Sequence, residues 1–284
     1  MVILRNEALT VTVDPHGAEL TSVCLRGRER LWQNENGSWA GHAPVLFPVC
    51  GATAMRLGGQ LYPCPRHGFA KNALFSIPKQ SEASVRLRLV SDDATMEMYP
   101  FSFCFDVVYA LTPDALSIAY EIRNTGSGVL HASCGGHDSF ALSGEVCEYA
   151  LRFAEEERLD DFLTDANGRL TGETKRLGTG EILDLSAPFL DNGGSICLDH
   201  LRSRAVTLFI KKTGETVARM EFPETEKLVL WHPTGSRMLC IEPWQTLPDA
   251  AGETLDFPEK DGVLAVPAGT LARVTRRITY GDAM

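Results

Sequence analysis

Residues 101–122 read FSFCFDVVYALTPDALSIAYEI, and this stretch decides the fold class of the chain. Apolar residues occupy every second position at 101–109 and again at 116–122. A period of two indicates strands with one buried face. Between the two runs, Thr112-Pro113-Asp114 has the composition of a tight turn. The stretch therefore predicts two neighbouring antiparallel strands.

The same alternation continues through most of the 284 residues. Short helical turns are predicted at 93–98 and 158–164, and residues 167–192 are predicted to form a long loop with short strands. Because no helix is long enough for a βαβ crossover, we expect an all-β fold, a large antiparallel β-sandwich. Without a linker or a repeat, residues 1–284 are expected to form a single domain. Further strands are expected at 2–5, 9–13, 18–25, 85–89, 128–132, 149–153, 205–211, 217–222, 228–231, 238–242 and 273–280.

Composition excludes several classes of partner. The formal net charge is −10, and an acidic surface repels nucleic acid and anionic lipid. The start, MVILRNEALT, is neither a signal peptide nor a membrane span, and no apolar run of 18 residues follows. The eight cysteines form no CxxC motif and no metal-ligand pattern, which is typical of reduced thiols. We expect a cytoplasmic protein without a metal.

Three segments differ from ordinary strand sequence. Residues 63–70, PCPRHGFA, hold His67 in a loop shaped by proline and glycine. Residues 134–140, CGGHDSF, place two glycines before His137. Residues 240–244, CIEPW, put Glu242 beside Trp244 at the end of an apolar strand. Imidazoles and carboxylates bind sugar hydroxyls, and aromatic faces pack on C–H surfaces, so together they favour a sugar site.

In order and spacing, these segments resemble the aldose 1-epimerase (galactose mutarotase-like) family, in particular its bacterial LacX-like branch. The resemblance implies a supersandwich of antiparallel strands, in agreement with the period of two. It runs nearly end to end and is carried by residues 43–48 (APVLFP), 65–70 (PRHGFA), 135–137 (GGH), 170–174 (LTGET), 201–208 (LRSRAVTL) and 240–244 (CIEPW).

The resemblance also implies a reaction, the interconversion of the alpha and beta anomers of a hexose or related sugar. His137 matches the family's acid, which protonates the ring oxygen, and Glu242 matches the base, which takes the proton of the anomeric hydroxyl. His67 matches a second histidine near the ring oxygen. Imidazole titrates near neutral pH and can both give and recover a proton. No cofactor is expected, and the expected partner is a small sugar.

Two positions depart from the family pattern and concern the groups that bind hydroxyls. The family's sugar-binding arginine is replaced by Ala52, and Arg56 or Arg66 is expected to supply the cation instead. The family's aspartate falls at Gly194, with Asp191 as the nearest candidate to replace it. A further change puts Asp138-Ser139 after the histidine, where Pro-Ala is common. We expect an intact acid–base pair with an altered substrate preference.

Three functions stay open at this level. The first is a mutarotase for a free or modified hexose. The second is a hexose-6-phosphate 1-epimerase, for which Lys71 and Arg237 join Arg56 and Arg66 as candidate phosphate ligands. The third is a sugar-binding or sensing protein without turnover, against which the retained acid–base pair argues. Nothing in the sequence marks a subunit interface, so both a monomer and a homodimer stay open.

Overall fold

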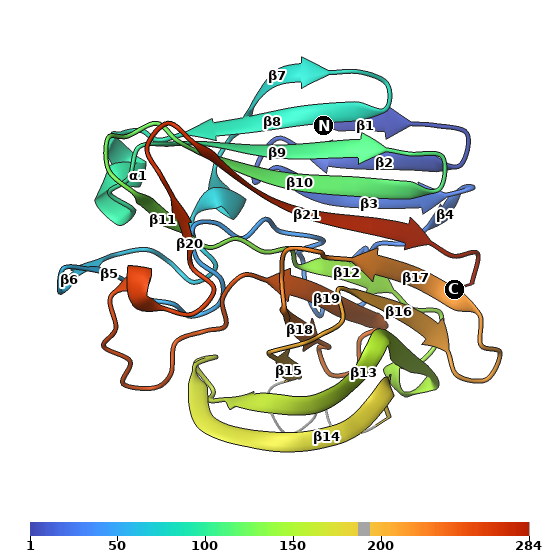
Figure 1. Cartoon of the computed structure of the whole chain (residues 1–284). Helices are drawn as coiled ribbons and strands as arrows, with labels where there is room; N and C mark the ends of the chain where they lie inside the picture. Colours follow the sequence, from blue (N-terminus) through green and yellow to red (C-terminus); the bar gives the residue numbers. More distant parts are fainter. Residues whose placement is uncertain (187–193, 284) are drawn as a thin grey trace.

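The predicted all-β architecture is confirmed by a computed structural model that describes residues 1–186 and 194–283 (Figure 1). A small antiparallel sheet opens the chain, with its four strands in sequence order. The strands of this sheet form because their side chains alternate between two faces. In Leu9–Asp14, for example, buried and half-buried residues alternate, as the period of two predicts. The strands of this sheet are β1 (Val2–Arg5), β2 (Leu9–Asp14), β3 (Glu19–Leu25) and β4 (Arg28–Glu29).

A larger antiparallel sheet has 13 strands in the order β12-β19-β18-β15-β13-β16-β17-β21-β10-β9-β8-β7, with β14 paired to β13. The predicted 101–122 hairpin is confirmed as β9 and β10, in which Leu111 pairs with Leu116. The strands are β7 (Ser76–Gln80), β8 (Ser84–Val90), β9 (Phe103–Leu111), β10 (Ala115–Asn124), β12 (Asp138–Ala141), β13 (Tyr149–Thr164), β14 (Leu170–Asp184), β15 (Ser195–Leu198), β16 (Ala205–Ile210), β17 (Thr216–Glu221), β18 (Lys227–Trp231), β19 (Met238–Trp244) and β21 (Leu271–Tyr280).

Short elements complete the described part of the chain. The helical turn predicted at 93–98 is confirmed as α1 (Asp93–Met98), whose N-cap Asp92 forms a capping box with Thr95. The other elements are the strand pairs β5 (Met55–Leu57) with β6 (Gln60–Tyr62) and β11 (Leu130–Ala132) with β20 (Leu264–Val266), and the 3₁₀ turns η1 (Ala70–Asn72), η2 (Val146–Glu148) and η3 (Phe257–Glu259).

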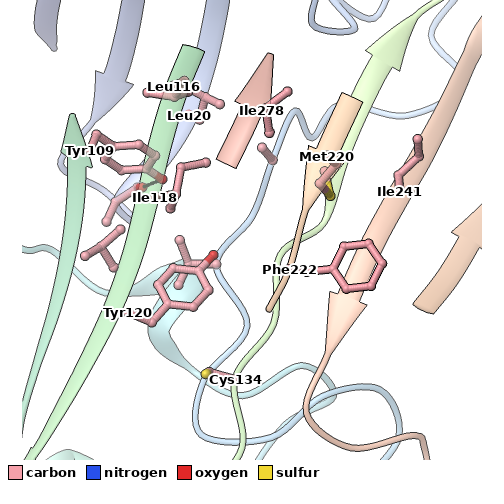
Figure 2. Close-up of a cluster of buried hydrophobic side chains, with 14 of the residues drawn as sticks. Leu20, Tyr109, Leu116, Ile118, Tyr120, Cys134, Met220, Phe222, Ile241 and Ile278 are labelled. Carbon is pink, nitrogen blue, oxygen red and sulfur yellow. Dashed lines mark hydrogen bonds between the residues drawn. The ribbon is translucent and has the colours of Figure 1, made fainter. Parts of the chain in front are cut away.

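The core lies between the small sheet and the inner face of the large one. Figure 2 shows side chains from both: Leu20 of β3 lies near Leu116 and Ile118 of β10. The hydroxyl of Tyr109 donates to the carbonyl of Ala18 at 2.8 Å, which links the two sheets by a buried hydrogen bond. Each of these side chains is at most 1% exposed, so the core is dry and closely packed.

Two predictions about the middle of the chain are wrong. Residues 158–164 are not a helical turn but the second half of β13, and 170–184 are one strand rather than a loop. The two strands form a long curved hairpin (Figure 1), with register shifts along its length. β14 is mostly exposed, and its apolar pattern is weak. It still forms a strand because pairing with β13 satisfies the N–H and C=O groups of its backbone.

Backbone bridges between distant segments set the position of the loops that carry the site. Leu46 pairs with Gly135, Gly135 pairs with Trp244, and Phe47 pairs with Gly68. At Gly68, φ is +73°, and a Cβ atom would lie 1.9 Å from the carbonyl oxygen of Phe47. Only glycine fits this approach. As a result, residues 44–51, 65–70, 134–137 and 242–244 meet at one end of the large sheet.

No helix in residues 1–186 and 194–283 is long and apolar enough to cross a membrane. All eight cysteines are free thiols, as expected, and five of them are buried.

Phe105→Ala is expected to destabilise the protein by about 3–5 kcal/mol, because the fully buried ring stacks on Phe47 at 4.2 Å. Urea unfolding followed by tryptophan fluorescence measures the loss. The matched control is Val90→Ala on the outer side of the same sheet, where the side chain is 54% exposed. Equal shifts for both variants would contradict this description of the core.

Candidate active site

A pocket of about 700 Å³ lies at this end of the large sheet. Its lining residues come from loops and strand ends. The β13–β14 hairpin forms one wall, and tryptophan side chains form another. Aromatic rings and a few polar side chains line it together, as in sites for small ligands. The lining residues are Trp39, Pro44, Leu46, Arg66, His67, Lys71, His137, Thr164, Asp165, Ala166, Gly168, Ser195, Val229, Trp231, Glu242 and Trp244.

His137 and Glu242 face each other in this pocket. Nε2 of His137 lies 3.3 Å from Oε2 of Glu242, and their side chains are 12% and 1% exposed. Within the described residues, Oε2 of Glu242 and Nδ1 of His137 have no hydrogen-bond partner. Buried polar atoms without a partner are costly and are concentrated at functional sites.

The surrounding elements explain this placement. On β19, Met238, Cys240 and Glu242 share one face by the alternation of strand side chains. His137 directly precedes β12, which pairs with β19 so that Asp138 lies opposite Ile241. The ring of Trp39 stacks on His137 at 5.0 Å with an interplanar angle of 26°, which fixes the plane of the imidazole.

Burial shifts the two groups in opposite directions. It lowers the pKa of His137 to about 3, so the imidazole favours its neutral form. Burial, assisted by the charge of Asp138, raises the pKa of Glu242 well above its ordinary value, while Arg66 acts in the opposite direction. The pair therefore favours its uncharged state, in which one proton resides on the carboxyl group.

His67 is held by two hydrogen bonds to Gly51. Its backbone N–H donates to the carbonyl of Gly51 at 3.0 Å, and the Gly51 N–H donates to Nδ1 of the ring at 3.1 Å. Burial, followed by the nearby charges of His137 and Arg66, lowers the pKa of His67 well below its ordinary value. Nε of Arg66 also donates to Nε2 of the ring at 3.3 Å; a neutral imidazole has one accepting nitrogen, so it accepts from Gly51 or from Arg66 but not from both.

Of the predicted site residues, five line the pocket: His67, His137, Glu242, Arg66 and Trp244. The indole N–H of Trp244 donates to the carbonyl of Gly136 at 3.2 Å, and its ring meets His67 edge to face at 5.4 Å. This hydrogen bond connects the strand end to the loop that carries His137.

One predicted sugar-binding residue does not line this pocket, and another lies outside the described residues. Arg56 lies on the β5–β6 hairpin, bonds to the carbonyl of Gly59 and does not line the pocket. Asp191 lies outside the described residues. At Gly194, where the resemblance places an aspartate, φ is +84° and a Cβ would approach the carbonyl oxygen of His232 to 2.4 Å. A side chain is therefore not tolerated at Gly194.

Several lining residues were missed from the sequence. Trp39 and Trp231 meet at 5.3 Å and enclose His137 on two sides. Tryptophan is rare in the chain, with four residues, and this rarity is a signal that sequence analysis could have used. The positions of the two residues, one in a loop and one in a strand, gave no indication of a shared site. Thr164 and Asp165 come from the hairpin whose structure was predicted wrongly.

A buried ion pair packs against the loop that carries His137. Nε of Arg276 lies 2.7 Å from Oδ2 of Asp138, and both side chains are at most 3% exposed. A Cβ atom on Gly136 would lie 2.6 Å from Cζ of Arg276, so the guanidinium lies directly against the glycine turn. Arg276 also lies over the ring of Tyr120 at 5.0 Å.

Within residues 1–186 and 194–283, two groups of side chains have the donor atoms to hold a metal ion. His137, Cys240 and Glu242 bring one ligand atom each within 4.8 Å of one another. Burial raises the pKa of Cys240 well above its ordinary value, which keeps the thiol protonated and weakens it as a ligand. The second group is Asp199, His200 and Glu226, but Nζ of Lys227 already lies 3.1 Å from Asp199 and supplies the cation there.

Arg276→Met is expected to destabilise the protein by about 3–5 kcal/mol, because it leaves the Asp138 carboxylate buried without its partner. Chemical unfolding measures the cost. The double variant Asp138→Leu, Arg276→Met is expected to recover part of it. The control is the neighbouring Arg277→Met, whose surface pair with Asp114 contributes about 1 kcal/mol at most. A double variant no more stable than Arg276→Met would contradict the pairing.

Glu242→Gln is expected to raise the melting temperature, and the gain grows as pH rises. The folded-state pKa of Glu242 is above its ordinary value of 4.5, so its contribution to stability is complete below 4.5. That contribution is lost as pH rises through the folded-state pKa. Thermal scans from pH 4.5 to 9 measure the difference, with exposed Glu82→Gln as control. A gain that is independent of pH would contradict the assignment.

Comparisons with known proteins identify the family of the chain. The aldose 1-epimerase family model matches residues 1–258. The plasmid-encoded protein LacX of Lactococcus lactis subsp. lactis is 30% identical over 283 residues, covering 93% of each chain.

Solved structures give the same result. A galactose mutarotase-like protein from Lactobacillus casei ATCC 334 superposes with a TM-score of 0.91 at 26% identity, covering 98% of this chain and 99% of that one. A galactose mutarotase related enzyme from Lactobacillus acidophilus gives a TM-score of 0.88 at 25% identity, covering 100% and 98%. The resemblance seen in the sequence is thereby confirmed, and the chain belongs to the aldose 1-epimerase family.

Proposed function

We propose that the protein is an aldose 1-epimerase that interconverts the alpha and beta anomers of a hexose or related sugar, with His137 and Glu242 as the acid–base pair. The observation that carries this proposal is the 3.3 Å contact between two buried titratable groups in a ligand-sized pocket. Family membership implies a sugar substrate and an isomerase activity.

The geometry of an anomeric centre matches such a pair. Its ring oxygen and its hydroxyl oxygen are bound to the same carbon, so adjacent acid and base groups can reach both at once. Nε2 of His137 would donate to the ring oxygen, and Oε2 of Glu242 would accept the hydroxyl proton. The unpartnered state of Oε2 is consistent with a ligand as its hydrogen-bond partner.

The pKa shifts of His137 and Glu242 favour one stage of the proposed proton transfer. Ring opening starts with the proton on His137 and ends with one on Glu242, while the bond from the anomeric carbon to the ring oxygen breaks and a carbonyl forms. Rotation about the next carbon–carbon bond presents the other face, and reclosure returns both protons. The open-chain stage therefore coincides with the uncharged pair, which burial favours.

Neighbouring groups would hold the sugar during this exchange. His67 and Arg66, whose Nε donates to Nε2 of His67 at 3.3 Å, would lie together beside an oxygen near the sugar ring. Trp39, Trp231 and Trp244 offer ring surfaces to the C–H faces of the sugar. These contacts orient the anomeric carbon without taking part in proton transfer.

His137→Asn and Glu242→Gln are each expected to reduce anomer exchange by at least about a hundredfold, because each removes one partner of the proton transfer. Saturation-transfer NMR on glucose and galactose measures the rate above the uncatalysed exchange. Matched controls are His200→Asn and Glu82→Gln, both exposed and outside the pocket.

Unfolding midpoints must show that all four variants are folded. Near-full activity in either pocket variant would refute the assignment of roles. Absence of exchange by the unmodified protein on a broad sugar panel, with binding retained, would instead support a sugar-binding protein.

A further inference from the structure

Two cations line the pocket of this otherwise acidic protein. Arg66 follows Pro65 in the loop of His67, and Lys71 lies in η1 a few residues later. Neither forms an ion pair within 4 Å among the residues that the structure describes, and both are close enough to influence His137. In contrast, Arg56 and Arg237, the other two candidates for a phosphate, do not line the pocket.

The Arg66 side chain is exposed to solvent, but contacts with two loops hold it across the pocket. Its Nε donates to Nε2 of His67 at 3.3 Å, which ties the guanidinium to the histidine loop. Its Nη1 and Nη2 lie against Gly168, where a Cβ atom would approach them to 3.0 Å. The guanidinium therefore extends from the His67 loop to the turn of the β13–β14 hairpin, with Gly168 leaving room for it.

The acidic groups of the pocket do not neutralise these cations. Oδ1 of Asp165 accepts from the backbone N–H groups of Asn167 and Arg169 at 2.8 and 3.0 Å, so this oxygen is engaged within its own turn. Glu242 lies deeper, 1% exposed, against His137. An anionic ligand would find two cationic donors on one wall, and arginine and lysine are the usual ligands of phosphate and carboxylate.

We infer that Arg66 and Lys71 form an anion-binding wall, and that the sugar exchanged by His137 and Glu242 carries a phosphate or carboxylate group. This inference rests on the proposed function and narrows its substrate class.

The test compares kcat/KM for anomer exchange of glucose, glucose 6-phosphate and glucuronate, each corrected for its uncatalysed rate. We expect a preference for an anionic sugar over glucose, and the two anionic probes distinguish phosphate from carboxylate. Lys71→Met and Arg66→Gln are each expected to reduce the anionic-to-neutral ratio by about ten- to a hundredfold. Added salt is expected to reduce the ratio as well.

Arg56→Gln is the matched control, because it removes a cation outside the pocket and is expected to leave the ratio unchanged. Equal kcat/KM for all three sugars, or an unchanged ratio in Lys71→Met and Arg66→Gln, would overturn the inference while leaving epimerase activity intact.

If no sugar is exchanged, the proposed function fails, and titration calorimetry with glucose and glucose 6-phosphate decides the inference separately. Tighter binding of the phosphate, lost in Lys71→Met and retained in Arg56→Gln, would support the anion-binding wall. Equal binding of both sugars would refute it.

Discussion

The close approach of backbone segments at Gly68 and Gly135 is the constraint on which the pocket depends. Gly135 lies between Leu46 and Trp244 and pairs with both, so three parts of the chain meet at one residue. A Cβ atom there would lie 2.7 Å from Cδ1 of Trp244. The absence of a side chain allows this contact, and the loops that hold His67 and His137 are positioned by it.

Burial is the second determinant of the chemistry. The same environment lowers the pKa of His137 and raises that of Glu242, because a low-dielectric interior disfavours either charge. The pair is consequently a place where stability is given up for reactivity: Oε2 of Glu242 and Nδ1 of His137 are among the buried polar atoms that have no hydrogen-bond partner in the described residues. Beneath it, Arg276 and Asp138 hold each other through contacts of 2.7 and 3.1 Å, which separates the support from the reacting groups.

The fold was predictable wherever the hydrophobic alternation was strong. The strand pairs around residues 101–122 were found because one face packs on the core and the other meets solvent. Prediction succeeded for residues 149–153 but failed for the second half of β13 and for β14, where Glu155, Glu156 and the exposed residues of β14 hide the period of two. Very short strands such as β12 and β15 were missed because they are too short to show any period.

The sequence alone determined that the chain is an all-β protein and that two histidines and a glutamate lie in unusual, glycine- and proline-shaped segments. It also indicated the family through the order of those segments. Only the tertiary structure decided that Arg66 and Lys71 enter the pocket while Arg56 does not, and that Trp39 stacks on His137. The physical reason is that strand formation depends on local alternation, whereas a pocket is made by loops whose positions are set by contacts between residues far apart in the chain.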